Sequence, residues 1–154
     1  MEERNSSFFR FEDLRIYTKS VDYSQWLLAN SNSDSEAAKA LFNSFYHSAF
    51  DIALNIAEGS SRTKNQFEHF LKIAKSAIRE CVVYTSIAEN AGYFTVAQTE
   101  TSRESLMELT RMIGALILSL QKGSRPRNEH SFDPSSPDEI DTNIELPYTE
   151  NDNL

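Results

Sequence analysis

Glu58 is the residue whose position first suggests chemistry. It stands directly before Gly59, where a helix is predicted to end, and the negative end of the helix dipole disfavours a carboxylate there. A catalytic carboxylate would need a second acid, a cysteine or a histidine at a suitable spacing, and the neighbouring sequence places none. The other interpretation is structural: Asn55, Glu58 and Gly59 form a corner, where Glu58 binds the free N–H groups of the next helix or pairs with Arg62.

A basic stripe follows this corner on the solvent side of the next predicted helix. At about 100° per residue, its helical members fall within an arc of about 80°. Such a stripe can contact the phosphates of RNA or DNA. The alternative is an ordinary solvated face, because Glu68 lies within the stripe and no aromatic residue interleaves it. The candidate residues are Arg62, Lys64, Lys72, Lys75 and Arg79.

The remaining reactive residue types are too sparse for a site. His47 and Asp51 lie four residues apart and could share a metal, but two ligands are too few for a protein site. His69 is not part of an H-E-x-x-H motif, and His130 lies far along the chain. The single cysteine, Cys81, falls on an apolar helix face, which predicts packing. We therefore expect no catalytic residue, no metal and no cofactor, hence a protein that is not an enzyme.

Capping residues and glycines divide the chain into four apolar repeats with helical spacing. They predict helices over residues 11–30, 34–58, 64–91 and 96–122. Three capping boxes begin at Ser33, Thr63 and Thr95, and the stops are Gly59, Gly92 and Gly123. Short loops make neighbouring helices antiparallel, so the predicted fold is all-α, an up-down-up-down four-helix bundle.

Charge and composition set the domain boundaries. We predict an N-terminal extension over residues 1–10, the bundle over 11–123 and an acidic tail over 124–154. The tail carries two basic and eight acidic residues, a net charge of −6, which leaves −2 of the total of −8 for residues 1–123. The tail is expected to be flexible, unless its few apolar residues dock on the bundle or on a neighbouring subunit. With one cysteine and no long apolar run, the chain is expected to be cytoplasmic, with no membrane contact.

The first predicted helix is apolar on two sides, which favours self-association. One side holds Ile16, Tyr23 and Leu27, and the other holds Leu14, Tyr17, Val21 and Leu28. One of these sides is enough to face the core of a bundle, so the other is free to contact a second subunit. Phe9, Trp26 and Phe50 are further candidates for a subunit contact, with simple core packing as the alternative.

Three segments of the chain resemble one known family. They are "FEDLRIY", "NIAEGSSR" and "FEHFLKIAKSAIRE", and the resemblance covers residues 9–122. The chain resembles the bacterial four-helix-bundle proteins encoded in 23S rRNA intervening sequences, often labelled ribosomal-protein-like. The resemblance implies a ring, commonly a pentamer, and carries no catalytic residues. The family is similar to the accessory protein of diversity-generating retroelements, which binds nucleic acid and a reverse transcriptase.

Two hypotheses about function follow from the stripe and from this resemblance. The first is a nucleic-acid or ribonucleoprotein accessory protein, whose partners are RNA or DNA. The second is an oligomeric protein-interaction scaffold without nucleic-acid binding, whose partner is another protein. Both expect a homo-oligomer.

Overall fold

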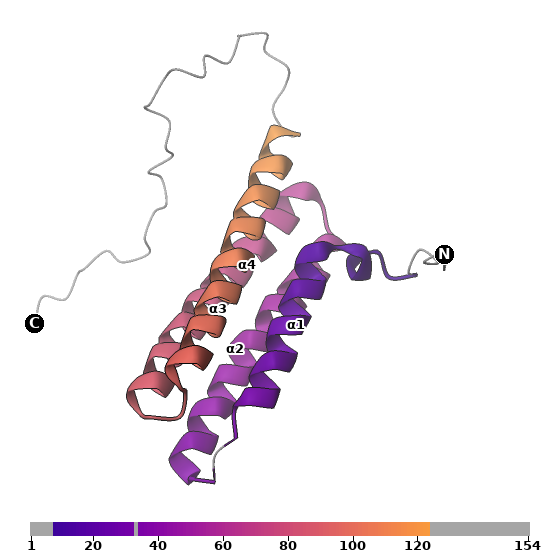
Figure 1. Ribbon diagram of the computed structural model, residues 1–154. Helices are drawn as coiled ribbons and strands as arrows, with labels where there is room; N and C mark the ends of the chain where they lie inside the picture. The colour runs from indigo at the N-terminus through magenta and orange to yellow at the C-terminus, as the bar shows by residue number, and fades with distance from the viewer. Residues whose placement is uncertain (1–7, 33, 124–154) are drawn as a thin grey trace, which may run out of the picture.

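Four long helices make up the fold in the computed structural model, which describes residues 8–32 and 34–123. They are α1 (Arg15–Asn30), α2 (Glu36–Ser60), α3 (Lys64–Asn90) and α4 (Val96–Lys122), preceded by a short 3-10 turn, η1 (Arg10–Asp13). α1 packs on α2 and α4, and α3 packs on the same two helices, so α1–α2 and α3–α4 are opposite sides of the bundle (Figure 1). The predicted all-α four-helix fold is confirmed.

Two of the predicted helix starts are built as the sequence indicated. Thr63 accepts a hydrogen bond from the Gln66 amide, and the Gln66 side chain accepts one from the Thr63 amide, which is a complete capping box. The same reciprocal pair joins Thr95 and Gln98 at the start of α4. Gly92 ends α3 with a φ of 77°, the left-handed conformation that favours glycine.

The other two starts differ from the prediction. α1 begins at Arg15 rather than near Phe11, because Leu14 is extended, with φ −75° and ψ 122°, and separates the 3-10 turn from the helix. α2 is capped by Ser35, whose hydroxyl accepts from the Ala38 amide at 3.1 Å. Ser33, the predicted cap, lies outside the described residues. Ser33 and Ser35 both precede helix-forming sequence, so spacing alone did not show which of the two serines caps the helix.

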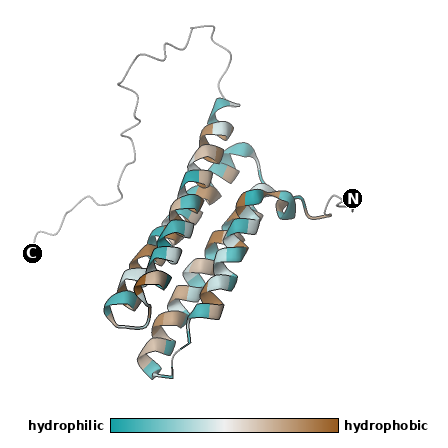
Figure 2. Cartoon of the chain, viewed as in Figure 1, coloured by the Kyte–Doolittle hydropathy of each residue, from teal (hydrophilic) through white to brown (hydrophobic). Residues whose placement is uncertain are grey.

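Apolar side chains from all four helices meet along the bundle axis, and hydrophobic and hydrophilic residues recur along each helix (Figure 2). Leu71 of α3 is fully buried. Val96 is 66% exposed, because it lies at the first position of α4, before the helix enters the core. The largest fully buried side chains include Phe45, Leu27, Ile52, Ile56, Leu106, Leu109 and Ile113.

A chain of hydroxyl groups crosses this core and ties three helices together. Tyr23 of α1 is hydrogen-bonded to Ser102 of α4 at 2.9 Å, and Ser102 to Thr85 of α3 at 2.8 Å. Thr85 also donates to the Cys81 carbonyl at 2.7 Å. Buried hydroxyls are costly without partners, so these bonds favour one register of the three helices.

Replacing Ser102 by alanine is expected to destabilise the fold by about 1–2 kcal/mol, because the buried Tyr23 and Thr85 hydroxyls each lose a partner. Urea denaturation measures the effect. The control is Thr101→Ala, which removes a hydroxyl from an exposed position one residue away and should change stability by less. Equal effects of the two substitutions would contradict a structural role for the hydroxyl chain.

Along two of the seams between neighbouring helices, the contacting residues follow opposite orders on the two helices. On the α1–α4 seam, residue numbers rise on α1 while they fall on α4. The pairs on this seam are Lys19 with Glu108, Tyr23 with Ser102, and Asn30 with Gln98. The α3–α4 seam follows the same rule, with Glu68 bound to Gln121 and Ser86 bound to Arg103.

Among the described helices, none combines the length and the apolar character that a membrane span requires.

Candidate nucleic-acid interface

Glu58 pairs with Arg62 at the corner between α2 and α3. Its carboxylate accepts from the Arg62 Nε at 3.1 Å and also contacts a terminal guanidinium nitrogen. The predicted clamp, in which Glu58 binds the first N–H groups of α3, is replaced by this pair, since Thr63 and Gln66 cap that helix themselves. Asn55 donates to the Asp51 carbonyl one turn earlier in its own helix, so it does not serve the corner.

Gly59 is a packing residue rather than a helix stop, which corrects the prediction. α2 continues through it to Ser60, and Gly92 is the one described glycine with a positive φ. A Cβ atom at Gly59 would lie 2.6 Å from the Cβ of Phe70 and 2.8 Å from a ring carbon of Phe67. The missing side chain therefore lets α2 and α3 approach closely at the corner.

The exposed Glu58–Arg62 pair predicts a small effect of mutation. Glu58→Ala is expected to cost about 0.2–1 kcal/mol, because both side chains are about half exposed and solvent screens their attraction. Arg62→Ala in the same background should add little, since both changes remove one interaction. Chemical denaturation of the two single variants and the double variant checks this. A loss above about 2 kcal/mol for Glu58→Ala would show that the carboxylate has a partner other than Arg62.

The predicted stripe on α3 lies on the edge of that helix that faces α4. Glu68 and Ser86 mark this edge, because they bind Gln121 and Arg103 of α4 at 2.7 Å and 2.9 Å. On the helix wheel, the stripe falls in the same arc of about 80° as Glu68 and Ser86. The residues concerned are Lys64, Lys72, Lys75 and Arg79, of which Lys75 is half-buried and the others exposed.

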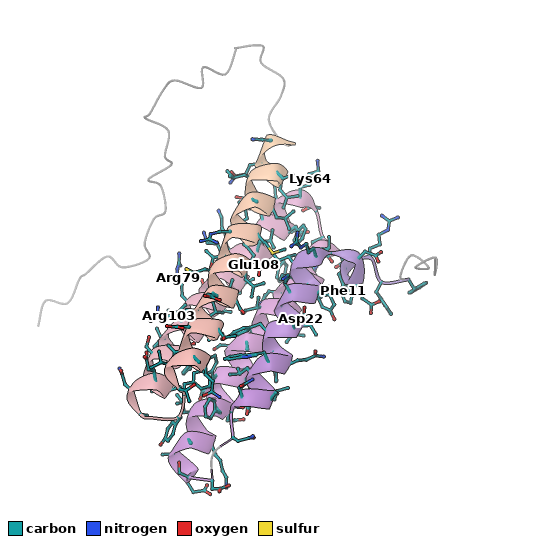
Figure 3. The ribbon with its side chains drawn as sticks, viewed as in Figure 1. Phe11, Asp22, Lys64, Arg79, Arg103 and Glu108 are labelled. Atoms are coloured by element: carbon teal, nitrogen blue, oxygen red, sulfur yellow. The ribbon has the colours of Figure 1, made fainter. Side chains whose placement is uncertain are left out.

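Arg103 and Arg111 extend this cationic surface from α4, and sequence reasoning missed them. Arg103 reaches across the seam to Ser86, and Arg111 falls within about 80° of it on the α4 wheel. Arg79 and Arg103 both lie on the side of the bundle away from Phe11 (Figure 3). We call this surface the basic face: Lys64, Lys72, Lys75 and Arg79 of α3 with Arg103 and Arg111 of α4. Sequence reasoning missed Arg103 and Arg111 because local spacing does not show which helix packs beside α3.

Most cations of the basic face form no salt bridge with another described residue, although the exposed Glu100 falls within the same arc of the α4 wheel. Among the described residues, only Lys72 of this face forms a salt bridge, with Glu68 at 3.2 Å. The Gln121 hydrogen bond and then Lys72 lower the pKa of Glu68, which therefore stays ionised. Lys64 lies at the end of the face against Gly123, where the C-terminal dipole of α4 favours a cation.

Arg62, the fifth predicted contact, is placed apart from the basic face. Its guanidinium pairs with Glu58 and lies 5.7 Å from the centre of the Phe70 ring, a cation–π contact at the α2–α3 corner. Between the cations of the basic face, Met107 and Leu118 of α4 are about half exposed. The face therefore combines charged with aliphatic side chains, and none of its named residues is an aromatic that could stack on a base.

A small cleft lies on the other side of α4, between α4 and α1. Its volume is about 200 Å³, below the range of about 300–1,000 Å³ that small-molecule sites usually occupy. Lys19 bridges to Glu108 across its wall at 3.3 Å. Trp26 lines the cleft, stacks on Tyr23 and is half-buried against the core. The lining residues are Lys19, Asp22, Tyr23, Trp26, Ser105, Glu108 and Leu109.

The other reactive residue types form no site among the residues with described positions. No group of three potential metal ligands occurs there, and His47 and His69 are exposed. Cys81 is fully buried, as predicted, and burial, followed by the charges of Glu80 and Asp51, raises the pKa of its thiol. The raised pKa keeps the thiol protonated, and a protonated thiol is a poor nucleophile. His130 lies outside the described residues.

A second surface, on the α1–α2 side, is apolar. Tyr17, Val21 and Leu28 lie on the same side of α1 as Ser24, which bonds to the Ala49 carbonyl of α2. Leu54 is 62% exposed and Phe50 36% exposed on the outer side of α2. We call this surface the apolar face: Tyr17, Val21 and Leu28 of α1 with Phe50 and Leu54 of α2. Phe9, also predicted as a contact, is 56% exposed beyond the start of α1.

One known family matches most of the bundle. A search of curated proteins gives no match. The family model described as 23S rRNA-intervening sequence protein matches residues 12–115, which span η1 in part, α1 to α3 and most of α4. The match covers more than half of the chain and includes the α2–α3 corner. The chain therefore belongs to the 23S rRNA-intervening sequence protein family.

Proposed function

We propose that the protein is a nucleic-acid or ribonucleoprotein accessory protein that binds the phosphate backbone of RNA or DNA through the basic face. The observation that carries the proposal is that two helices bring cations to one surface and that most of them lack an acidic partner among the described residues. The net charge of −2 over residues 1–123 does not oppose it, because the local field near the phosphates decides binding. Backbone contacts of this kind are largely independent of sequence.

The same proposal treats the protein as non-enzymatic. The family is one of unknown function. Cys81 is buried, the α1–α4 cleft is small, and Lys19 in that cleft already pairs with Glu108. The proposal also places the protein in the cytoplasm, a reducing compartment where a free thiol such as Cys81 persists.

Self-association is the second part of the proposal. The opposed order of contacts along the seams supports an antiparallel up-down-up-down bundle, in which the apolar and basic faces lie on opposite sides. Subunits joined through the apolar face would leave every basic face open. The resemblance to ring-forming proteins favours a pentamer, and several linked faces would bind one long nucleic acid more tightly than a single face.

Binding of single-stranded RNA and of duplex DNA to the full chain tests the function. We expect affinity to fall steeply between about 50 mM and 200 mM salt, because bound phosphates release counterions. Light scattering with size-exclusion chromatography tests assembly, where a clean monomer at micromolar concentration would overturn the oligomer. Absence of binding at the lower salt concentration would overturn the nucleic-acid function.

A protein-interaction scaffold is the second candidate, and the apolar face is the observation that favours it. Exposed aromatic and aliphatic side chains on neighbouring helices are typical of a protein contact. The two candidates differ in one result: a scaffold assembles normally and binds neither RNA nor DNA.

A further inference from the structure

The acidic tail leaves the bundle beside the basic face. α4 ends at Lys122, and a Cβ atom at Gly123 would lie 2.9 Å from the Nζ of Lys64, the first cation of the face. The hydrogen bond from Gln121 to Glu68 holds this end of α4 against α3. The chain therefore enters the tail at one end of the basic face.

The charges of the tail complement those of this face. After Arg125 and Arg127, every charged residue of the tail is acidic. The acids within residues 129–145 are Glu129, Asp133, Asp138, Glu139, Asp141 and Glu145. On the basic face, Lys75, Arg79 and Arg111 form no salt bridge with another described residue, so they are open to an anionic partner.

The tail is also long enough to reach these cations. From Lys64 to Arg79 the face extends about 22 Å, at 1.5 Å per residue of helix. Residues 129–145 begin six positions after Gly123, and an extended chain can reach about 20 Å over that distance. Tethering gives such a segment an effective concentration near the millimolar range, so weak contacts suffice.

We propose that residues 129–145 of the chain's own tail occupy the basic face and compete there with nucleic acid. The competition rests on the proposed function, whereas the docking of the tail does not. A polyanion of higher charge density would displace the tail from the face, and weakly bound anions would be excluded. The tail thus sets a threshold for binding.

A full-length variant in which the six acids of residues 129–145 become the matching amides tests both parts. Without nucleic acid, we expect acetylation of Lys64, Lys72 and Lys75 to be several-fold faster in this variant than in the wild type, with Lys39 on α2 unchanged. With a short single-stranded RNA at low salt, the variant should bind about tenfold more tightly or better, and high salt should remove the difference. The control for net charge changes six exposed acids outside the tail and the basic face to the matching amides: Glu12, Asp13, Asp22, Asp34, Asp51 and Glu80. It should leave the acetylation rates unchanged and alter the RNA affinity by no more than a few-fold.

The two readouts separate the inference from the proposed function. Faster acetylation without RNA binding by either protein supports docking and overturns the nucleic-acid function. RNA binding of equal strength, with equal acetylation rates, overturns the tail inference and leaves the function standing. Faster acetylation with equal RNA affinity overturns the proposed competition between the tail and RNA for the basic face.

Discussion

Gly59→Ala is expected to destabilise the protein by about 2–3 kcal/mol, and Gly59→Val by more. The added Cβ would overlap the Cβ of Phe70 at 2.6 Å, an atom next to the α3 backbone that no side-chain rotation can move away. The two helices would have to separate at the corner, which would loosen the packing on both sides. The better helix propensity of alanine, about 1 kcal/mol, offsets only part of this loss. Urea denaturation of the full chain measures it.

Gly114→Ala is the matched control for this prediction. Gly114 also lies inside a helix, but nothing lies within 4 Å of the position its Cβ would occupy. That substitution should stabilise the protein by about 0.5–1 kcal/mol, because only the propensity term remains. If both substitutions stabilise the protein, α2 and α3 do not approach closely at the corner.

Reversing charge on the basic face is expected to abolish most nucleic-acid binding. The variant Lys75→Glu, Arg79→Glu, Arg103→Glu should bind single-stranded RNA about 100-fold more weakly, or weaker still, at low salt, because it removes three cations and adds repulsion. The slope of log affinity against log salt should become shallower by about one for each phosphate that the variant no longer neutralises. Arg79 and Arg103 are exposed and Lys75 is half-buried, so none of the three lies in the core and the fold should persist.

The control reverses three cations outside the basic face: Arg10, Arg15 and Lys39. It changes the net charge by the same amount, and all three residues are exposed. We expect a change of only a few-fold, from the overall charge. Equal reductions in affinity for the two triple variants would mean that net charge rather than this face governs binding.

Local sequence signals were sufficient for most of the fold. The boxes at Thr63 and Thr95 and the stop at Gly92 follow from interactions within a few residues, so spacing alone predicts them. Gly59 shows the limit of this reasoning. A glycine at a helix end usually stops the helix, but here it serves a contact with Phe70 on the next helix. Which role a glycine has depends on the packing partner, which the sequence does not state.

The basic face, too, was predictable only in part from the sequence. The arc of cations on α3 follows from helical periodicity, and the structure places that arc beside α4. Arg103 joins it only because Ser86 lies opposite, a relation between residues far apart in the chain. Arg62 was predicted as part of the stripe, yet it pairs with Glu58. Spacing had allowed two partners for the Glu58 carboxylate, Arg62 and the first N–H groups of the next helix. Tertiary contacts decided both cases.

Lysine footprinting of the full chain with and without single-stranded RNA is the decisive measurement for the basic face. We expect RNA to protect Lys64, Lys72 and Lys75 from acetylation, since these amines would contact phosphates there. Lys19, in the α1–α4 cleft, and Lys39, on α2, are internal references and should react at unchanged rates. Uniform protection of all five lysines, or protection of Lys19 and Lys39 alone, would contradict the assignment of nucleic-acid binding to the basic face.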